Sequence, residues 1–147
     1  MGHQDADLWT CPECGQKFAT ENLWHSCGSF TLEALFAGVQ PQVWRTYQAF
    51  ERMAREVADF HVIPQKTRVS FQLRTRCSGG SPMKSYFRAS FVLRNVTITP
   101  RIDKIQSFAP DQHVHYVRLA NPEEVDEDIR ALLLASTEYG EQQGRHG

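Results

Sequence analysis

Several common sequence features are missing from this chain. It has no apolar run of about 18 residues, so no segment predicts a membrane-spanning helix. It also lacks a G-x-S-x-G motif, a P-loop and a dinucleotide-binding fingerprint, which leaves no signature of the commonest hydrolases, nucleotidases and dehydrogenases. Cysteine is scarce, with only four residues, and three of them lie near the start, so a disulfide framework is not expected. The residues from Met1 to Leu8 are polar and acidic, so we expect no signal peptide and a cytoplasmic protein.

Four potential metal ligands lie close together in the segment WTCPECGQKFATENLWHSCG, from Trp9 to Gly28. Their spacing is C-x2-C-x10-H-x-C, and they are Cys11, Cys14, His25 and Cys27. Three cysteines and one histidine form a common closed ligand set for structural zinc, with no position left for a catalytic water. The sequence therefore predicts a zinc knuckle over residues 1–29. A redox role for the C-x2-C pair is the alternative, but it lacks a βαβ context and leaves the other two ligands unexplained.

The first half of this knuckle resembles a C2H2 zinc finger, and the second half departs from that pattern. His25 and Cys27 are two residues apart, which places them about 200° apart around a helix. A regular helix therefore has to end near His25 for both to bind one ion. The helix that a zinc finger inserts into the major groove would be shortened, so DNA readout of that type is not expected.

The charge is divided unevenly along the chain, although the net charge is only −1. The residues from Phe60 to Pro110 include nine basic side chains and one acidic side chain, Asp103. Both flanking segments carry more acidic than basic residues. A basic middle third of this kind indicates an anionic partner.

Two helices are expected after the knuckle. Thr31 is a suitable N-cap for a short helix from Leu32 to Ala37, which Gly38 ends. A longer helix is expected at about residues 41–59, because Pro41 suits a first turn. Its apolar residues recur at steps of three and four and define one buried face: Val43, Tyr47, Phe50, Ala54 and Val57.

From Thr67 the apolar period changes to two, which predicts a half-buried strand. A second alternating run surrounds Phe87 to Leu93, and the glycine-rich segment Cys77 to Pro82 between the runs reads as a turn or loop. The two runs therefore predict a β-hairpin. Shorter strands are expected at Arg101 to Phe108 and His113 to Leu119.

The last helix has clear start signals, with Asn121 as the N-cap and Pro122 as the first helical residue. A disordered tail is expected over residues 141–147. The whole pattern predicts an α+β fold with three parts: the zinc knuckle, an α+β domain over residues 30–140 and the tail. In that domain, helices pack on one face of an antiparallel sheet of about four strands, and a C-terminal helix closes the fold.

Several stretches together resemble a family of small bacterial proteins of unknown function. They are WTCPECG with HSCG, the Leu-Glu-x-x-Phe-Ala-Gly segment, PQKTRVSFQ, DQHVHYVRL and NPEEVDEDI, in this order. The resemblance covers the chain up to about Tyr139 and implies the order of elements and the fold type. It implies no reaction and no catalytic residue.

The first candidate site is a basic sheet face. Side chains two apart on a strand point to one face, so the arginines of the two alternating runs are expected to converge there. They are Arg68, Arg74 and Arg76 in one run and Arg88 and Arg94 in the next. Lys66 is expected at the rim, and Ser70, Gln72, Tyr86 and Ser90 can add hydrogen bonds. Arginine suits phosphate and carboxylate, but an ordinary solvated face is the alternative.

The second candidate site is the pair His113 and His115, which share one face if this segment is a strand. Two imidazoles in this arrangement suit an acid–base pair or a metal site. No third ligand lies nearby in the sequence, so hydrogen-bonded structural histidines are the alternative.

Three functions remain open. The leading hypothesis is a zinc-stabilised binding module whose basic sheet face holds an anionic ligand, with nucleic acid as the expected partner. The second is a small enzyme that acts on an anionic substrate, with His113 and His115 in catalysis and an arginine clamp. The third is a protein-interaction adaptor that exposes Trp9, Trp24 or Trp44. No membrane partner is expected, and the sequence does not define an oligomeric state.

Overall fold

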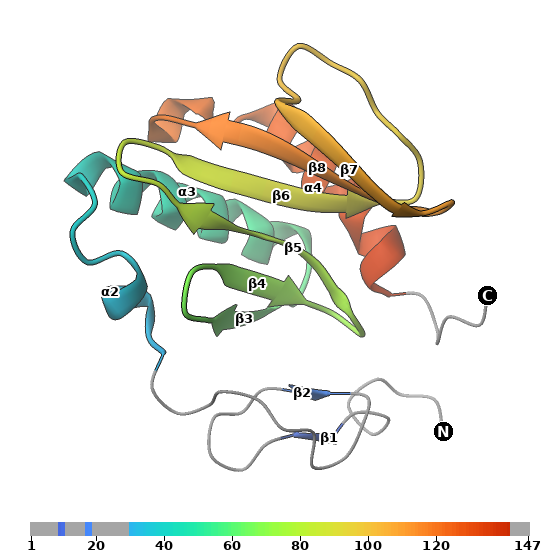
Figure 1. The fold of residues 1–147 in the computed structure, drawn as a ribbon, viewed down its shortest axis with the longest axis horizontal. Coiled ribbons are helices and arrows are strands. Elements are labelled where there is room, and N and C mark those ends of the chain that lie inside the picture. The colour runs from blue at the N-terminus through green and yellow to red at the C-terminus, as the bar shows by residue number, and fades with distance from the viewer. Residues whose placement is uncertain (1–8, 11–16, 19–29, 142–147) are drawn as a thin grey trace.

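The computed structural model describes residues 9–10, 17–18 and 30–141, and the last of these ranges forms one α+β domain (Figure 1). The predicted zinc ligands Cys11, Cys14, His25 and Cys27 lie outside the described residues, as do residues 142–147 of the predicted tail. Near the start, β1 (Trp9–Thr10) and β2 (Lys17–Phe18) pair in antiparallel fashion. The domain then begins with the short helix α2 (Leu32–Leu35) and the long helix α3 (Pro41–Val57).

Six antiparallel strands form the sheet of the domain (Figure 1). In chain order they are β3 (His61–Pro64), β4 (Val69–Gln72), β5 (Arg76–Pro82), β6 (Phe87–Leu93), β7 (Lys104–Ala109) and β8 (Gln112–Leu119). Their spatial order is β3-β4-β5-β6-β8-β7, so only the last two strands exchange places relative to the chain. The predicted count of about four strands is therefore too low.

The segment that we predicted as the loop Cys77 to Pro82 is instead part of β5, in the middle of the sheet. It carries turn-forming residues because its two glycines lie where a side chain has no room. A Cβ atom at Gly80 would collide with the backbone of Arg88 and the ring of Phe87. The predicted hairpin is also wrong, because β5 lies between β4 and β6 and pairs with both.

The strand expected after Thr67 is β4, and all four of its residues are buried rather than half of them. Val69 and Phe71 point to the helices, as their apolar character predicts. Ser70 and Gln72 are also buried on the opposite face, where the Ser70 hydroxyl donates a hydrogen bond to Oε1 of Gln65 at 2.5 Å. The polar side chains of this strand are therefore part of a packed surface rather than a solvated one.

The C-terminal helix starts later than predicted. Pro122–Glu124 forms the separate 3-10 helix η1, and α4 (Glu127–Gly140) follows it. The carboxylate of Asp126, not Asn121, caps α4 by accepting a hydrogen bond from the backbone N–H of Asp128 at 3.2 Å.

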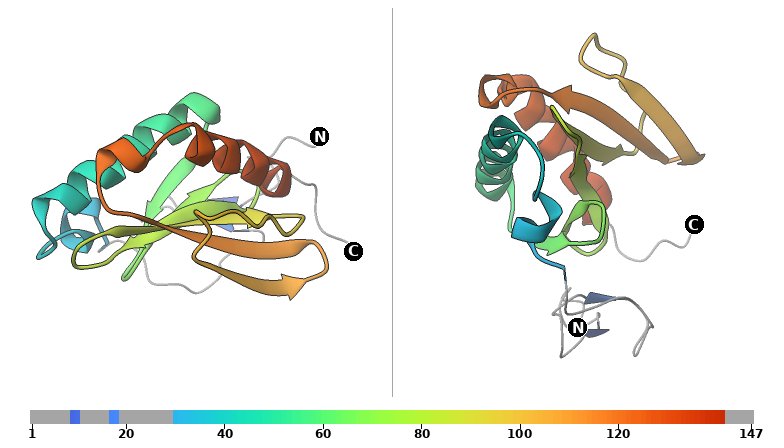
Figure 2. Two further views of the ribbon diagram at one scale, coloured as in Figure 1. Left: turned by 90° about the horizontal axis from the view of Figure 1, so that it is seen from above. Right: turned by 60° about the vertical axis from the view of Figure 1, so that its left-hand side comes forward.

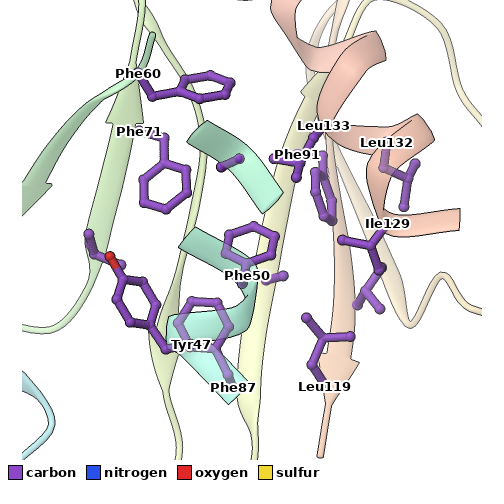
Figure 3. Close-up of a cluster of buried hydrophobic side chains, with 14 of the residues drawn as sticks. Tyr47, Phe50, Phe60, Phe71, Phe87, Phe91, Leu119, Ile129, Leu132 and Leu133 are labelled. Atoms are coloured by element: carbon purple, nitrogen blue, oxygen red, sulfur yellow. The ribbon is translucent and has the colours of Figure 1, made fainter. Parts of the chain in front are cut away.

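Helices α3 and α4 cover the same face of the sheet, as predicted, and leave the other face toward the viewer in Figure 1 (Figure 2). Aromatic side chains are prominent in the layer between these helices and the sheet (Figure 3). Phe50 of α3 lies at the centre, with ring centroids 5.4 Å from Phe71, 5.5 Å from Phe87 and 5.9 Å from Phe91. The predicted face of α3 is confirmed for Val43, Tyr47, Phe50 and Ala54, which are buried, whereas Val57 at the end of the helix is only half-buried.

The edges of the sheet are short or irregular. At one edge β3 pairs over four residues and ends at Pro64. At the other edge β7 has a register shift between Ser107 and Ala109, and its first residue, Lys104, is exposed. The longest strand, β8, is therefore enclosed by β6 and β7.

Candidate anion-binding site

A cavity of about 400 Å³ lies among residues of the sheet face that α3 and α4 leave uncovered. Thr67 and Arg68, in the turn before β4, line this cavity. Residues 80–82 of β5 and the next residue, Met83, line it as well. The remaining lining residues are Arg88 and Ser90 of β6 and Tyr116 of β8. Paired residues on neighbouring strands explain this grouping, because Ser81 lies opposite Arg88 and Ser90 lies opposite Tyr116.

Arg68 is half-buried at this cavity and reaches across β5. Its Nη2 atom donates a hydrogen bond to the hydroxyl oxygen of Ser90 at 3.2 Å. Between them lies Gly79, with φ +135°, where a Cβ atom would be only 2.9 Å from Nη2 of Arg68. Burial lowers the pKa of the Arg68 guanidinium from its ordinary value; Tyr116 partly opposes this shift, and the positive charge of Arg76 adds to it.

Arg88 lies over an aromatic ring at the same cavity. Its guanidinium carbon is 4.3 Å from the ring centroid of Tyr116, a cation–π contact. The Tyr116 hydroxyl donates a hydrogen bond to Oε1 of Gln106 at 2.8 Å, which fixes the ring that supports Arg88. The Arg88 guanidinium therefore lies against a ring that a hydrogen bond holds in place.

The cavity contains positive charge without a balancing carboxylate. None of its lining residues is acidic, and neither Arg68 nor Arg88 forms an ion pair within the part of the chain that the structure describes. A partly desolvated cation favours a counter-anion, because burial has removed some of the water that otherwise stabilises the charge. An anionic ligand is therefore the chemistry that this cavity fits.

Only two of the six predicted ligand-binding residues line the cavity, namely Arg68 and Arg88. Arg76 begins β5, close enough for its charge to affect Arg68. The alternation that grouped Arg74 with them ends at Gln72, and the backbone N–H of Arg74 donates to the carbonyl of Gly140 at 2.8 Å. Lys66 is exposed in the turn before β4, and Arg94 is exposed beyond the end of β6.

Tyr116 is the site residue that sequence reasoning missed as a ligand-binding candidate. The strand parity that placed His113 and His115 on one face placed Tyr116 on the other, the face of the arginines. What the sequence lacked was the pairing of β6 with β8, which sets Tyr116 directly opposite Ser90. A single strand pattern gives the face of a side chain but not its neighbour across the sheet.

The predicted histidine pair does not join this cavity. His115 is fully buried opposite Phe91, on the face that the helices cover. Its Nε2 atom accepts a hydrogen bond from the backbone N–H of Thr97 at 2.9 Å, so its proton is on Nδ1, which donates to the carbonyl of His113 at 2.9 Å. His113 is half-buried and bonds the Ser107 hydroxyl at 2.7 Å. Both residues have structural hydrogen bonds in place of a shared ligand.

We expect the buried His115 to make the protein less stable as the pH falls below about 6.5, the ordinary pKa of histidine. Burial lowers the pKa of His115 in the folded state, so the unfolded chain takes up a proton first. The resulting stability is fully present above about 6.5 and is lost toward the lower folded pKa, with a slope of at most about 1.4 kcal/mol per pH unit. Urea unfolding between pH 7.5 and pH 5 measures it.

A matched pair of variants identifies the responsible imidazole. His113→Gln removes the neighbouring, half-buried ring and should keep the pH dependence of the unfolding free energy. His115→Gln should remove it. An identical pH dependence in the His115→Gln protein would contradict this assignment.

A larger cavity, of about 720 Å³, lies beside α4, and its arginines are matched by a larger number of carboxylates among the lining residues. Nη1 of Arg101 pairs with Oδ1 of Asp126 at 3.0 Å and with Oδ2 of Asp128 at 3.5 Å. Its Nη2 atom donates to the carbonyl of Glu124 at 2.8 Å. These bonds tie the segment before β7 to the start of α4, so we assign this cavity a structural role.

The described ranges contain neither a metal-binding cluster nor a membrane-spanning helix. Within residues 9–10, 17–18 and 30–141, no three His, Cys, Asp or Glu side chains gather in a group that suits a metal ion. None of the helices in these ranges has the length and apolar character that a membrane crossing requires. Zinc at Cys11, Cys14, His25 and Cys27 stays a prediction.

The fold and this site define a small α+β domain with an arginine-lined cavity on its uncovered sheet face. The chain belongs to the family described as Domain of unknown function (DUF5655), which matches residues 32–139. The expected relation to a family of unknown function is thus confirmed for this part, and the match does not include the predicted knuckle. No curated protein and no solved structure matches the chain.

Proposed function

We propose that this chain is a binding module that holds an anionic ligand between Arg68 and Arg88, and that nucleic acid provides that ligand. The observation that carries the proposal is the cavity of about 400 Å³, which has two guanidinium groups and no acidic side chain among its described lining residues. A structural arginine in a partly buried position normally has a carboxylate partner. Among the residues that the structure describes, Arg68 has the Ser90 hydroxyl instead of a carboxylate, which leaves its charge for a ligand.

The surroundings of the cavity favour phosphate as the group that binds. Guanidinium groups match phosphate oxygens with paired N–H donors. Thr67 and Ser81 add hydroxyl donors to the lining. The segment from Phe60 to Pro110, which contains β3 to β7, carries nine basic residues and one acidic residue, so its field attracts a polyanion. Nucleic acid combines both properties.

The enzyme hypothesis receives less support. It requires a cavity that holds both predicted histidines together with at least one of the arginines. His115 is buried beneath the sheet and His113 bonds Ser107, and neither lines the arginine cavity. For the adaptor hypothesis only Trp44 can be judged, because Trp24 and the side chain of Trp9 lie outside the described residues. Trp44 is half-buried against Phe36, with 5.1 Å between the ring centroids, so it does not support an exposed anchor.

Labelled single-stranded and duplex DNA and RNA should bind the wild-type protein in a salt-dependent manner. We expect Arg68→Ala/Arg88→Ala to weaken binding by at least about 10-fold, because each lost charge-assisted hydrogen bond is worth about 1.5–3 kcal/mol. The slope of log K against log salt should fall by about 1.4–1.8, the contribution of two phosphate contacts. Fluorescence anisotropy between about 50 and about 200 mM salt measures both.

Arg45→Ala is the matched control for this experiment. Arg45 is exposed on α3, on the other side of the sheet, and its removal changes the net charge by the same amount per residue. It should leave the affinity nearly unchanged. Equal losses of affinity in the control and in the cavity variant would mean that net charge, and not the cavity, determines binding. The absence of binding to any nucleic acid at low salt would overturn the proposal.

A further inference from the structure

The positive charge of the cavity matches one form of phosphate better than another. This preference rests on the proposed function, because it concerns the phosphate that the cavity would bind. Arg68 and Arg88 together carry two positive charges, and no lining residue within the described ranges carries a negative one. A phosphate inside a nucleic-acid strand is a diester with one negative charge. A terminal phosphate is a monoester with about 1.5–2 negative charges at neutral pH and three free acceptor oxygens. Two guanidinium groups in one cavity match the monoester better.

The size of the cavity leads to the same result. Its volume of about 400 Å³ is near the lower end of the range of small-molecule sites, about 300–1,000 Å³. The turn that holds Thr67 and Arg68 and the segment that ends at Met83 border it, together with the surface of β6 and β8. A space of this size takes one phosphate with its sugar, whereas a strand that passes through needs a long groove.

The donors around the cavity suit three acceptor oxygens. Arg68 uses Nη2 for the Ser90 hydroxyl, and no other side-chain hydrogen bond of its guanidinium is formed within the described ranges, so its remaining N–H groups can donate to a ligand. The guanidinium carbon of Arg88 lies 4.3 Å from the ring centroid of Tyr116, so this ring supports the guanidinium before a ligand arrives. Burial has already lowered the pKa of Arg68, and a dianion would restore the stabilisation of its charge.

We infer that this cavity recognises a phosphomonoester, either the terminal phosphate of a nucleic-acid strand or the phosphate of a free mononucleotide. Ser90 is a positioning residue, because its hydroxyl holds Nη2 of Arg68 over Gly79. The preference for a terminal phosphate therefore depends on the paired N–H donors of the planar Arg68 guanidinium as well as on its charge.

The test compares one oligonucleotide with a 5′-phosphate, with a 3′-phosphate and with hydroxyl ends at fixed salt. We expect one of the phosphorylated forms to bind at least about 10-fold more tightly than the hydroxyl form, the effect of one charge-assisted hydrogen bond. Inorganic phosphate and a mononucleotide should compete with it. Arg68→Lys keeps the charge but loses the fork, and Ser90→Ala loses the positioning hydroxyl, so both should reduce the preference.

Arg45→Lys is the control for the conservative change and should keep the full preference. Equal binding of phosphorylated and hydroxyl ends would overturn this inference while leaving nucleic-acid binding intact. Direct binding of inorganic phosphate and of a mononucleotide, measured by calorimetry, without any oligonucleotide binding would support the monoester site and overturn nucleic acid as the partner. Binding that Arg68→Lys and Ser90→Ala leave unchanged would overturn the assignment to this cavity.

Discussion

Gly79→Ala is expected to lower the free energy of unfolding by about 2–6 kcal/mol, from about 1–3 for the strained backbone and about 1–3 for overpacking. Gly79 has φ +135°, a conformation that residues with a side chain rarely adopt. The new methyl group would also meet the carbonyl oxygen of Val69 and the guanidinium of Arg68. Because the first of these is backbone in the middle of the sheet, the strand itself has to move.

Gly38→Ala separates the two contributions in the same urea-unfolding experiment. Gly38 also has a positive φ, +85°, but a Cβ atom there has nothing within 4 Å. This variant should cost only about 1–2 kcal/mol, the backbone contribution alone. Equal losses in the two variants would mean that β5 tolerates a side chain at Gly79, and the close approach of Arg68 would then not depend on this glycine.

Phe50→Ala is expected to cost about 3–5 kcal/mol of unfolding free energy, the usual range for removal of a buried phenylalanine. Phe50 is fully buried and contacts aromatic rings on two strands, Phe71 of β4 and both Phe87 and Phe91 of β6. These rings are held by the sheet, so they can only partly close the cavity that the substitution leaves. Urea unfolding followed by fluorescence gives the value.

Phe108→Ala removes the same side chain from an exposed position and serves as the control. Phe108 lies on the edge strand β7 and is 62% exposed. Its removal should change the unfolding free energy by less than about 0.5 kcal/mol, as expected for a surface position. A small loss for Phe50→Ala, comparable to the control, would contradict the central place of Phe50 in the core.

The helices were easier to predict than the strands, and single residues explain the difference. Tyr47 and Phe50 repeat at helical spacing and face the sheet, so the period alone located α3. Strand β5 has no such period, because Gly79 and Gly80 replace the side chains that Arg68 and Phe87 would otherwise meet. Composition that signals a turn in most sequences here reflects close contact between strands.

The candidate site could be predicted where side chains alternate regularly between the two faces of a strand. Arg88 lies within a regular strand, and parity placed it correctly on the uncovered face. Parity failed for Arg74, because the backbone leaves the strand after Gln72 and turns toward Gly140. Tyr116 required knowledge of which strands pair, which one sequence does not contain. Zinc at the four predicted ligands lies outside the described residues and stays a prediction.

The irregular edges of the sheet have a consequence for how this protein behaves at high concentration. A straight, exposed edge strand can pair with the edge of another molecule and start aggregation. Pro64 offers no N–H at one edge, and at the other the register shift in β7 and the charged Lys104 interrupt a regular row of donors and acceptors. Edge-to-edge growth of the sheet into fibrils is therefore opposed on both sides.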